Sequence, residues 1–80
     1  MVNKSAKVFK KIREVRDMSL SDVAAKIGCS KQYVHLVETG KYDKPVEYAN
    51  QFTAALSITK AEVTELKSAL LDDYNSLFTF

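Results

Sequence analysis

The stretch SLSDVAAKIGCSKQYVHLVETG, residues 19–40, decides the fold of this 80-residue chain. Ser19 and Asp22 have the spacing of a capping box, which predicts that a helix begins at about Leu20. Gly28 ends that helix, because glycine readily adopts the left-handed conformation, and Ser30 can cap a second helix two residues later. So short a connection forces the two helices to cross steeply. The stretch therefore predicts a helix-turn-helix motif.

The second helix of this motif has an outer face of varied chemistry. Val34 and Val37 define its buried side at 100° per residue. The far side carries Gln32, His35 and Leu36, with Lys31 and Tyr33 flanking them. A merely solvated face would favour Glu and Lys, whereas these side chains can donate to a base edge, accept from it or touch its methyl group. We therefore expect residues 30–38 to form a recognition helix that reads DNA bases through Lys31, Gln32, His35 and Leu36.

The motif resembles the helix-turn-helix of the phage Cro and repressor family, also called the XRE type. The matching residues are Ser19, Val23, Ala24, Ile27, Gly28, Ser30, Val34, Val37, Glu38, Gly40 and Lys41. The similarity covers roughly residues 8–58. FKKIREVRDM, before the motif, is similar to the family's first helix, and KPVEYANQFTAAL continues the similarity after it. Two positions depart from the family pattern. Leu20 stands where the family often has a Gln that touches a phosphate, and Asp17 stands where Gly is common.

The resemblance implies a lambda-repressor-like fold and several residue roles. Arg13 and Glu38 occupy positions that form an ion pair in the family, the alternative being two unrelated surface charges. The loop after Gly40 would lie along the DNA backbone, the alternative being an ordinary solvated loop. The expected backbone contacts are Ser30, Tyr33, Lys41, Tyr42 and Lys44, although Tyr42 is equally suited to packing within the protein.

Composition and charge set limits on the class of protein. Hydrophobic residues make up 46% and charged residues 28% of the chain, and two Gly with one Pro favour helices over turn-rich sheet. One Cys and one His argue against a disulfide framework and against a zinc site. Residues 1–44 carry ten Lys and Arg against five acids, whereas residues 45–80 carry two against five. The basic half coincides with the motif, which suits a polyanionic partner on that side.

Apolar residues at helical spacing predict an all-α, compact bundle of about five helices around the motif. The expected core stripes contain Val8, Phe9, Ile12 and Val15, then Val23, Ala24 and Ile27, then Val46, Ala49, Phe52, Thr53 and Leu56 with Tyr48 at the edge. Ser5 can cap the first helix, and Pro45 can begin the fourth. Thr59 and Glu62 repeat the capping-box spacing and predict the start of the fifth helix. Cys29 is expected to be a small core residue.

The last segment, residues 59–80, is unusually apolar for the end of so small a domain. We expect it to be a C-terminal helix and tail within a single domain of residues 1–80. One interpretation folds it back on the core. The other, which we favour, uses it as a dimer interface formed by Leu70, Tyr74, Leu77, Phe78 and Phe80, because one small core cannot absorb so many apolar side chains.

These features predict a dimeric, sequence-specific transcription regulator, of the phage or mobile-element repressor type, that binds a pseudo-palindromic operator on double-stranded DNA. The alternative is an antitoxin whose C-terminal apolar surface binds a protein partner. An enzyme is disfavoured, since the sequence has no phosphate-cradling Gly loop and no paired catalytic carboxylates. We expect neither cofactor nor metal. Without a signal peptide or about 18 consecutive apolar residues, the chain is expected in the cytoplasm, at the nucleoid, and not in a membrane.

Overall fold

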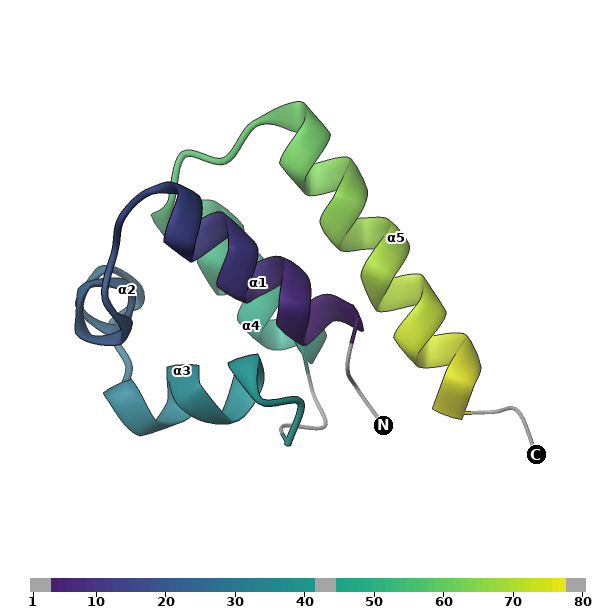
Figure 1. Cartoon of the computed structure of the whole chain (residues 1–80), viewed down its shortest axis with the longest axis horizontal. Helices are drawn as coiled ribbons and strands as arrows, with labels where there is room; N and C mark the ends of the chain where they lie inside the picture. Colours follow the sequence, from purple (N-terminus) through teal and green to yellow (C-terminus); the bar gives the residue numbers. More distant parts are fainter. Residues whose placement is uncertain (1–3, 42–44, 78–80) are drawn as a thin grey trace.

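The computed structural model describes the backbone of residues 4–41 and 45–77 and the side chains of residues 4–41 and 46–75. Within these ranges the chain forms α1 (Lys4–Val15), α2 (Leu20–Ile27), α3 (Lys31–Glu38), α4 (Pro45–Ala55) and α5 (Lys60–Leu77). No strand occurs in the described ranges. The predicted all-α bundle with a central helix-turn-helix is therefore confirmed (Figure 1).

Helix α1 lies antiparallel to α5, and α4 packs beside both (Figure 1). Ion pairs join the two antiparallel helices at intervals along their length. Lys4 Nζ lies 3.4 Å from Asp72, Lys11 Nζ lies 3.2 Å from Glu65, and Arg16 lies 2.7 Å from Glu62 at the other end. The first two pairs are largely solvent-exposed, so each contributes little to stability. Helices α2 and α3 lie on the side of α1 that faces away from α5 (Figure 1).

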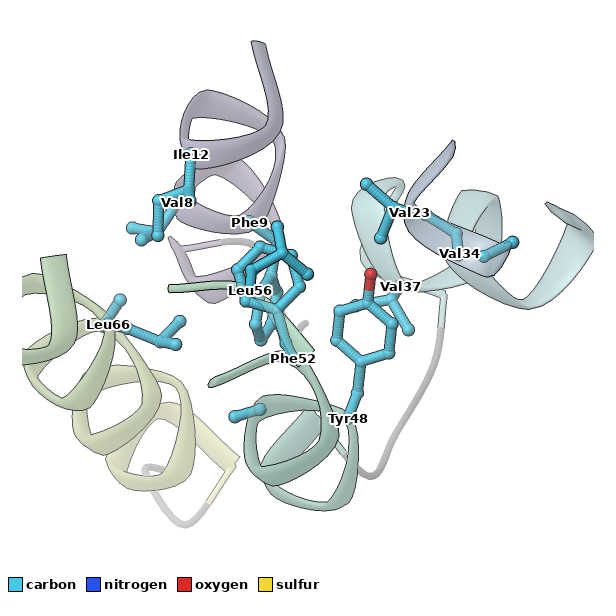
Figure 2. Packing of buried hydrophobic residues seen from close by; sticks show 13 residues of the cluster. Val8, Phe9, Ile12, Val23, Val34, Val37, Tyr48, Phe52, Leu56 and Leu66 are labelled. Atoms are coloured by element: carbon cyan, nitrogen blue, oxygen red, sulfur yellow. The ribbon is translucent and has the colours of Figure 1, made fainter. Parts of the chain in front are cut away.

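The core is centred on three aromatic rings from α1 and α4. Phe9, Tyr48 and Phe52 are fully buried. Phe9 meets Tyr48 edge-on with ring centroids 4.8 Å apart, and meets Phe52 in the same manner at 5.2 Å. Such edge-to-face pairs add to the free energy of apolar burial. The same cluster includes Val23 of α2, Val34 and Val37 of α3, and Leu66 of α5 (Figure 2), so every helix is anchored on one core.

The expected core stripes are wrong at three residues. Tyr48 lies at the centre and not at the edge, because its ring fills the space between α1, α3 and α4 (Figure 2). Val15 and Val46 are 71% and 58% exposed. Val15 is the last residue of α1 and Val46 the second of α4, and at both places the helix extends past the core.

The start of α1 differs from the expectation that Ser5 caps it. Ser5 lies inside the helix and is fully buried. The carboxylate of Asp73, from α5, accepts hydrogen bonds from the backbone N–H of Lys4 at 3.0 Å and of Ser5 at 2.9 Å, and from the Ser5 hydroxyl. A carboxylate from the far end of the chain therefore satisfies the first N–H groups of α1. Asp73 is buried to do so.

Three helices of the bundle end in a left-handed residue. Gly28 has φ 86° and Gly40 has φ 76°, while Asp17, with φ 55°, follows α1. Met18 N–H donates to Arg13 O at 3.2 Å and Asp17 N–H to Glu14 O at 3.0 Å, which is the hydrogen-bond pattern of a Schellman cap. Asp17 thus occupies a backbone position that glycine adopts at lower cost. This explains physically why its family counterpart is commonly Gly.

Candidate nucleic-acid interface

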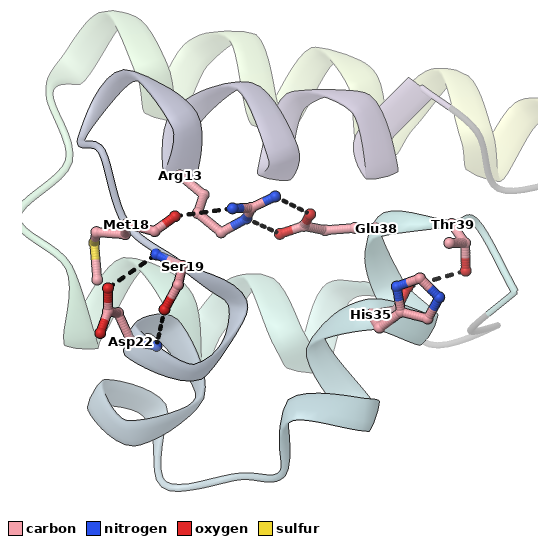
Figure 3. A network of polar contacts seen from close by, with 7 residues as sticks. All are labelled: Arg13, Met18, Ser19, Asp22, His35, Glu38 and Thr39. Carbon is pink, nitrogen blue, oxygen red and sulfur yellow. Dashed lines mark hydrogen bonds and ion pairs between the residues drawn. The ribbon is translucent and has the colours of Figure 1, made fainter.

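The turn between α2 and α3 is built as its sequence predicts. The Ser19 hydroxyl accepts from Asp22 N–H at 3.0 Å, and Asp22 accepts from Ser19 N–H at 2.9 Å, so the predicted capping box is confirmed (Figure 3). The hydrogen bonds from Ser19 lower the pKa of the Asp22 carboxyl. At the other end, Gly28 N–H donates to Ala24 O at 2.8 Å, and a left-handed Gly28 turns the chain into α3.

Helix α3 is fixed by one capped end and one buried side. The Ser30 hydroxyl accepts from Tyr33 N–H at 3.1 Å, which begins the helix. Val34 and Val37 are buried in the core. The four side chains expected to read bases therefore face outward, and Lys31, Gln32, His35 and Leu36 are all exposed. Leu36 keeps 42% of its surface in solvent.

Two residues expected to touch the DNA backbone also have roles inside the protein. Ser30 is the N-cap of α3, and its hydroxyl is exposed at the surface as well. The Tyr33 ring packs against the buried Tyr48 ring with centroids 5.6 Å apart and remains half-buried. Packing of this kind orients the start of α3 relative to α4.

The loop after α3 begins with a second left-handed glycine. Gly40 N–H donates to Val37 O and Lys41 N–H donates to Leu36 O, both at 3.1 Å. These bonds cap the C-terminus of α3 and hold Lys41, which is exposed, next to the outer face of that helix. Tyr42 and Lys44, the other expected backbone contacts of this loop, lie outside the described residues.

An open cleft of about 560 Å³ lies where α2 meets the outer face of α3. Its lining residues are Leu20, Lys31, Gln32, His35 and Leu36. Four of these are the residues predicted to read bases, and the structure brings them together with Leu20, the first residue of α2. The sequence comparison marks Leu20 only as the loss of a phosphate contact. Its half-buried apolar side chain belongs to the candidate reading surface.

Arg13 and Glu38 form a bidentate ion pair between α1 and the end of α3. Arg13 Nε donates to Glu38 Oε2 at 2.8 Å and Nη2 donates to Oε1 at 3.0 Å, while Nη1 donates to Met18 O at 2.8 Å (Figure 3). Only 13% of the Arg13 and 5% of the Glu38 side-chain surface is exposed. The hydrogen bond that Arg13 donates to Glu38 raises the pKa of the Arg13 guanidinium. The pair ties the end of α3 to α1 and to the turn before α2.

Sequence reasoning missed a second bidentate pair, at the start of α5. Arg16 Nη1 and Nη2 each donate to Glu62 at 2.7 Å, and Arg16 also donates to Ser57 O at 3.1 Å. Glu62 simultaneously accepts from Thr59 N–H at 2.8 Å, which confirms the predicted capping box of α5. The hydrogen bond from Arg16, followed by that from Thr59, lowers the pKa of the Glu62 carboxyl to about 2.

The C-terminal apolar residues that the structure describes differ in burial. Leu70 is half-buried and lines a groove of about 290 Å³ between α4 and α5, together with Val46. Leu71 and Tyr74 are each 59% exposed. Leu77 is the last helical residue, and Phe78 and Phe80 lie outside the described residues. Leu66 and Ala69 of the same helix are buried in the core.

Among the described residues, no group of three or more His, Cys, Asp and Glu side chains is placed to hold a metal ion. Cys29 is half-buried against the core, and burial raises the pKa of its thiol, which disfavours the reactive thiolate. In the part of the chain described here, no helix combines the length and apolar character needed to cross a membrane.

Comparison with known families assigns the fold that this geometry displays. A family model described as helix-turn-helix matches residues 9–63, more than half of the chain. The chain therefore belongs to this helix-turn-helix family of the Cro and repressor type, whose members are DNA-binding transcription regulators. Searches of curated proteins and of solved structures gave no match.

Proposed function

We propose that this helix-turn-helix protein is a sequence-specific regulator that binds a pseudo-palindromic operator as a dimer, with one α3 in the major groove of each half-site. The observation that carries the proposal is the outer face of α3. Its buried side is locked by Val34 and Val37, and its exposed side gathers Lys31, Gln32, His35 and Leu36 around one cleft. Rigid support behind a varied polar and apolar face is what base reading requires.

Each exposed side chain has a base edge that suits it. Gln32 can pair bidentately with adenine, Lys31 can donate to O6 and N7 of guanine, and Leu36 can cover a thymine methyl group. His35, one turn after Lys31, can donate to or accept from a neighbouring base. Ser30, Tyr33, Lys41, Tyr42 and Lys44 are the proposed contacts to phosphates, which position the helix and carry no sequence information.

The proposed dimer uses α5 and the residues that follow it. An 80-residue chain has a small hydrophobic core, so burial of more apolar surface between two subunits would add to its stability. A dimer also binds an operator far better than a monomer, because its two half-site contacts are linked. Exposed Leu71 and Tyr74 support the proposal. Leu70 would contribute through the groove that it lines with Val46, and Leu77, Phe78 and Phe80 extend the same end of the chain.

A second candidate function rests on the same surface. Exposed Leu71 and Tyr74 would equally suit a protein partner, as in an antitoxin that binds both DNA and a toxin. A protein with either function could be encoded by a phage or another mobile element, and either protein would act in the cytoplasm, at the nucleoid. The state of the purified chain separates them, because a self-associating protein favours the repressor and a monomer that assembles only with a partner favours the antitoxin.

DNA binding is tested by selecting duplexes from a pool with a randomised centre and measuring affinity by fluorescence anisotropy. Several Lys side chains per dimer should neutralise phosphates, so the slope of log affinity against log salt should be about −5 to −9 for about six to ten contacts. Gln32→Ala should cost about 1 to 3 kcal/mol on the selected duplex and much less on duplexes altered at its base pair. Lys44→Ala, the matched control, should weaken all sequences about equally.

A salt slope near zero would contradict DNA binding altogether. A uniform loss with Gln32→Ala, together with an altered base preference in Lys44→Ala, would show instead that the recognition surface lies elsewhere.

The dimer is tested by sedimentation velocity at tens of micromolar. Deleting residues 70–80 would also remove Asp73, which caps α1, so a point substitution is the cleaner change. Leu71→Glu places a charge on the proposed interface and should yield a monomer. Val15→Glu, at an apolar residue of α1 that is similarly exposed, should leave the dimer intact. A wild-type protein that stays monomeric would contradict the dimer proposal.

A further inference from the structure

The cleft between α2 and α3 combines residues that are separated in the sequence. Leu20 begins α2, whereas Lys31, Gln32, His35 and Leu36 occupy the first turn and the middle of α3. Leu20 is half-buried because it also packs against the core, and Leu36 is 42% exposed. The two leucines therefore supply an apolar lining to the cleft, in which Leu20 is held by the core and Leu36 is open to solvent.

The polar residues of the cleft define what can enter it. Lys31 supplies a cation and Gln32 an amide, both exposed at its rim. The cleft opens on the side of α3 opposite the buried Val34 and Val37. A molecule that binds the exposed side of α3 therefore contacts the cleft. An occupant should thus carry an apolar group beside hydrogen-bonding edges and negative charge.

The major groove of DNA offers one apolar group of this kind, the C5-methyl group of thymine, beside base edges that donate and accept and close to the phosphates. Leu36 alone can touch this methyl group from one side only. Leu20, from another helix, provides a second apolar contact, so that water is excluded and more of the methyl group is buried. A phosphate, in contrast, gains nothing from a leucine at residue 20.

We propose that Leu20 and Leu36 together hold the C5-methyl group of a thymine in each half-site, and that Leu20 is a specificity-determining residue contributed by α2. This inference rests on the proposed DNA binding. It assigns to α2 a part in sequence readout, whereas the proposed base contacts described above all come from α3. Thymine is then preferred over cytosine and over uracil at that position of each half-site.

The test begins with the wild-type protein and a duplex selected from a randomised pool. Each thymine of that duplex is replaced in turn by deoxyuracil, which removes only the methyl group. Replacement of the thymine in the cleft should lower affinity about fourfold, the amount that burial of one methyl group provides. Other thymines should change affinity little. This arm changes no residue of the protein, so folding of a variant does not affect it.

Protein variants then assign the methyl contact. Leu20→Ala should reduce the thymine-to-uracil ratio towards one, and Val15→Ala, at an exposed apolar residue of α1, should leave the ratio unchanged. Because Leu20 packs against the core, Leu20→Gln serves as a second variant that keeps aliphatic carbons at Cβ and Cγ for packing and has an amide in place of the two methyl groups. Circular dichroism confirms that each variant is folded before its affinity is compared.

The outcomes separate this inference from the proposed function. If no duplex is enriched, the proposed function is overturned and this inference with it. If a duplex is bound but no uracil replacement matters, the methyl contact is overturned while DNA binding stands. If one replacement matters equally in wild type and in both Leu20 variants, another residue reads the methyl group and the role of Leu20 is overturned. Loss of the preference in the Leu20 variants alone supports the inference.

Discussion

Replacement of Glu38 by alanine should be the most damaging single change among the ion pairs of this protein. Glu38 is only 5% exposed, and it accepts two of the three hydrogen bonds that Arg13 donates. Without Glu38, the guanidinium keeps only Met18 O as a hydrogen-bond acceptor, at a site where 13% of the Arg13 side chain is exposed in the intact protein. Breaking a buried pair in this way costs about 3 to 5 kcal/mol.

That loss is large relative to the stability available. A domain of this size has a free energy of unfolding of about 4 to 12 kcal/mol, at about 0.05 to 0.15 kcal/mol per residue. Each kcal/mol lowers the melting temperature of so small a domain by about 4 to 8 °C, so Glu38→Ala should lower it by at least about 12 °C. The measurement is urea or thermal unfolding followed by circular dichroism.

Glu62→Ala is the matched control, because Glu62 also pairs bidentately with an arginine but is 20% exposed. Water reaches the arginine left behind there, so loss of the pair itself should cost little. Glu62→Ala also removes the hydrogen bond that Glu62 accepts from Thr59 N–H, so the total cost should be about 1 to 2 kcal/mol. Replacing both Arg13 and Glu38 by apolar residues of similar volume should recover most of the loss. If Glu38→Ala costs no more than Glu62→Ala, burial does not set the strength of these pairs and the reasoning is wrong.

Three further predictions concern stability. Asp17→Gly should raise the free energy of unfolding by about 0.5 to 1 kcal/mol, because residue 17 has φ 55°, which glycine adopts without steric cost. Asp17→Ala should give no gain, and equal effects of the two substitutions would refute the backbone argument. Tyr48→Phe should stabilise the protein by about 1 kcal/mol in urea unfolding, since the buried Tyr48 hydroxyl has no hydrogen-bond partner among the described residues. A loss of stability would show that this hydroxyl does have a hydrogen-bond partner. Because folding lowers the pKa of Glu62 to about 2, its contribution to stability is complete above about pH 4.5, the ordinary range of a glutamate, and is lost as the pH falls towards 2. Glu62→Gln should flatten that part of the stability profile, and an unchanged slope would assign it to other carboxyls.

The sequence alone was sufficient for features that depend on neighbouring residues. Capping boxes at Ser19 and Thr59 and the left-handed turn at Gly28 all lie within a few residues of the helices they bound. A helix end is determined by the hydrogen bonds of its own last turn, so local spacing predicts it. The outward position of Gln32 follows in the same way from Val34 and Val37, because helical periodicity fixes which side chains lie opposite a buried pair.

Periodicity was less informative about the extent of the core. Val15 and Tyr48 show its limit, since the first continues an apolar stripe yet is 71% exposed, and the second was expected at an edge yet is fully buried. A stripe gives a direction around the helix axis, not the distance along the axis over which a neighbouring helix covers it. That coverage is set by how α1, α4 and α5 pack, which no single helix encodes.

Only the tertiary structure revealed the contacts between residues far apart in the chain. Asp73 caps α1 from 68 residues away, and Arg16 reaches Glu62 across 46. An acidic residue on α5 looks like any other solvated carboxylate until the antiparallel packing brings it to the start of α1. The cleft that joins Leu20 to Leu36 arises likewise from the crossing of α2 and α3. The chain's local spacing thus determined the helices and the reading face, whereas partners across the fold were decided by the packing of those helices, because proximity in space depends on every helix at once.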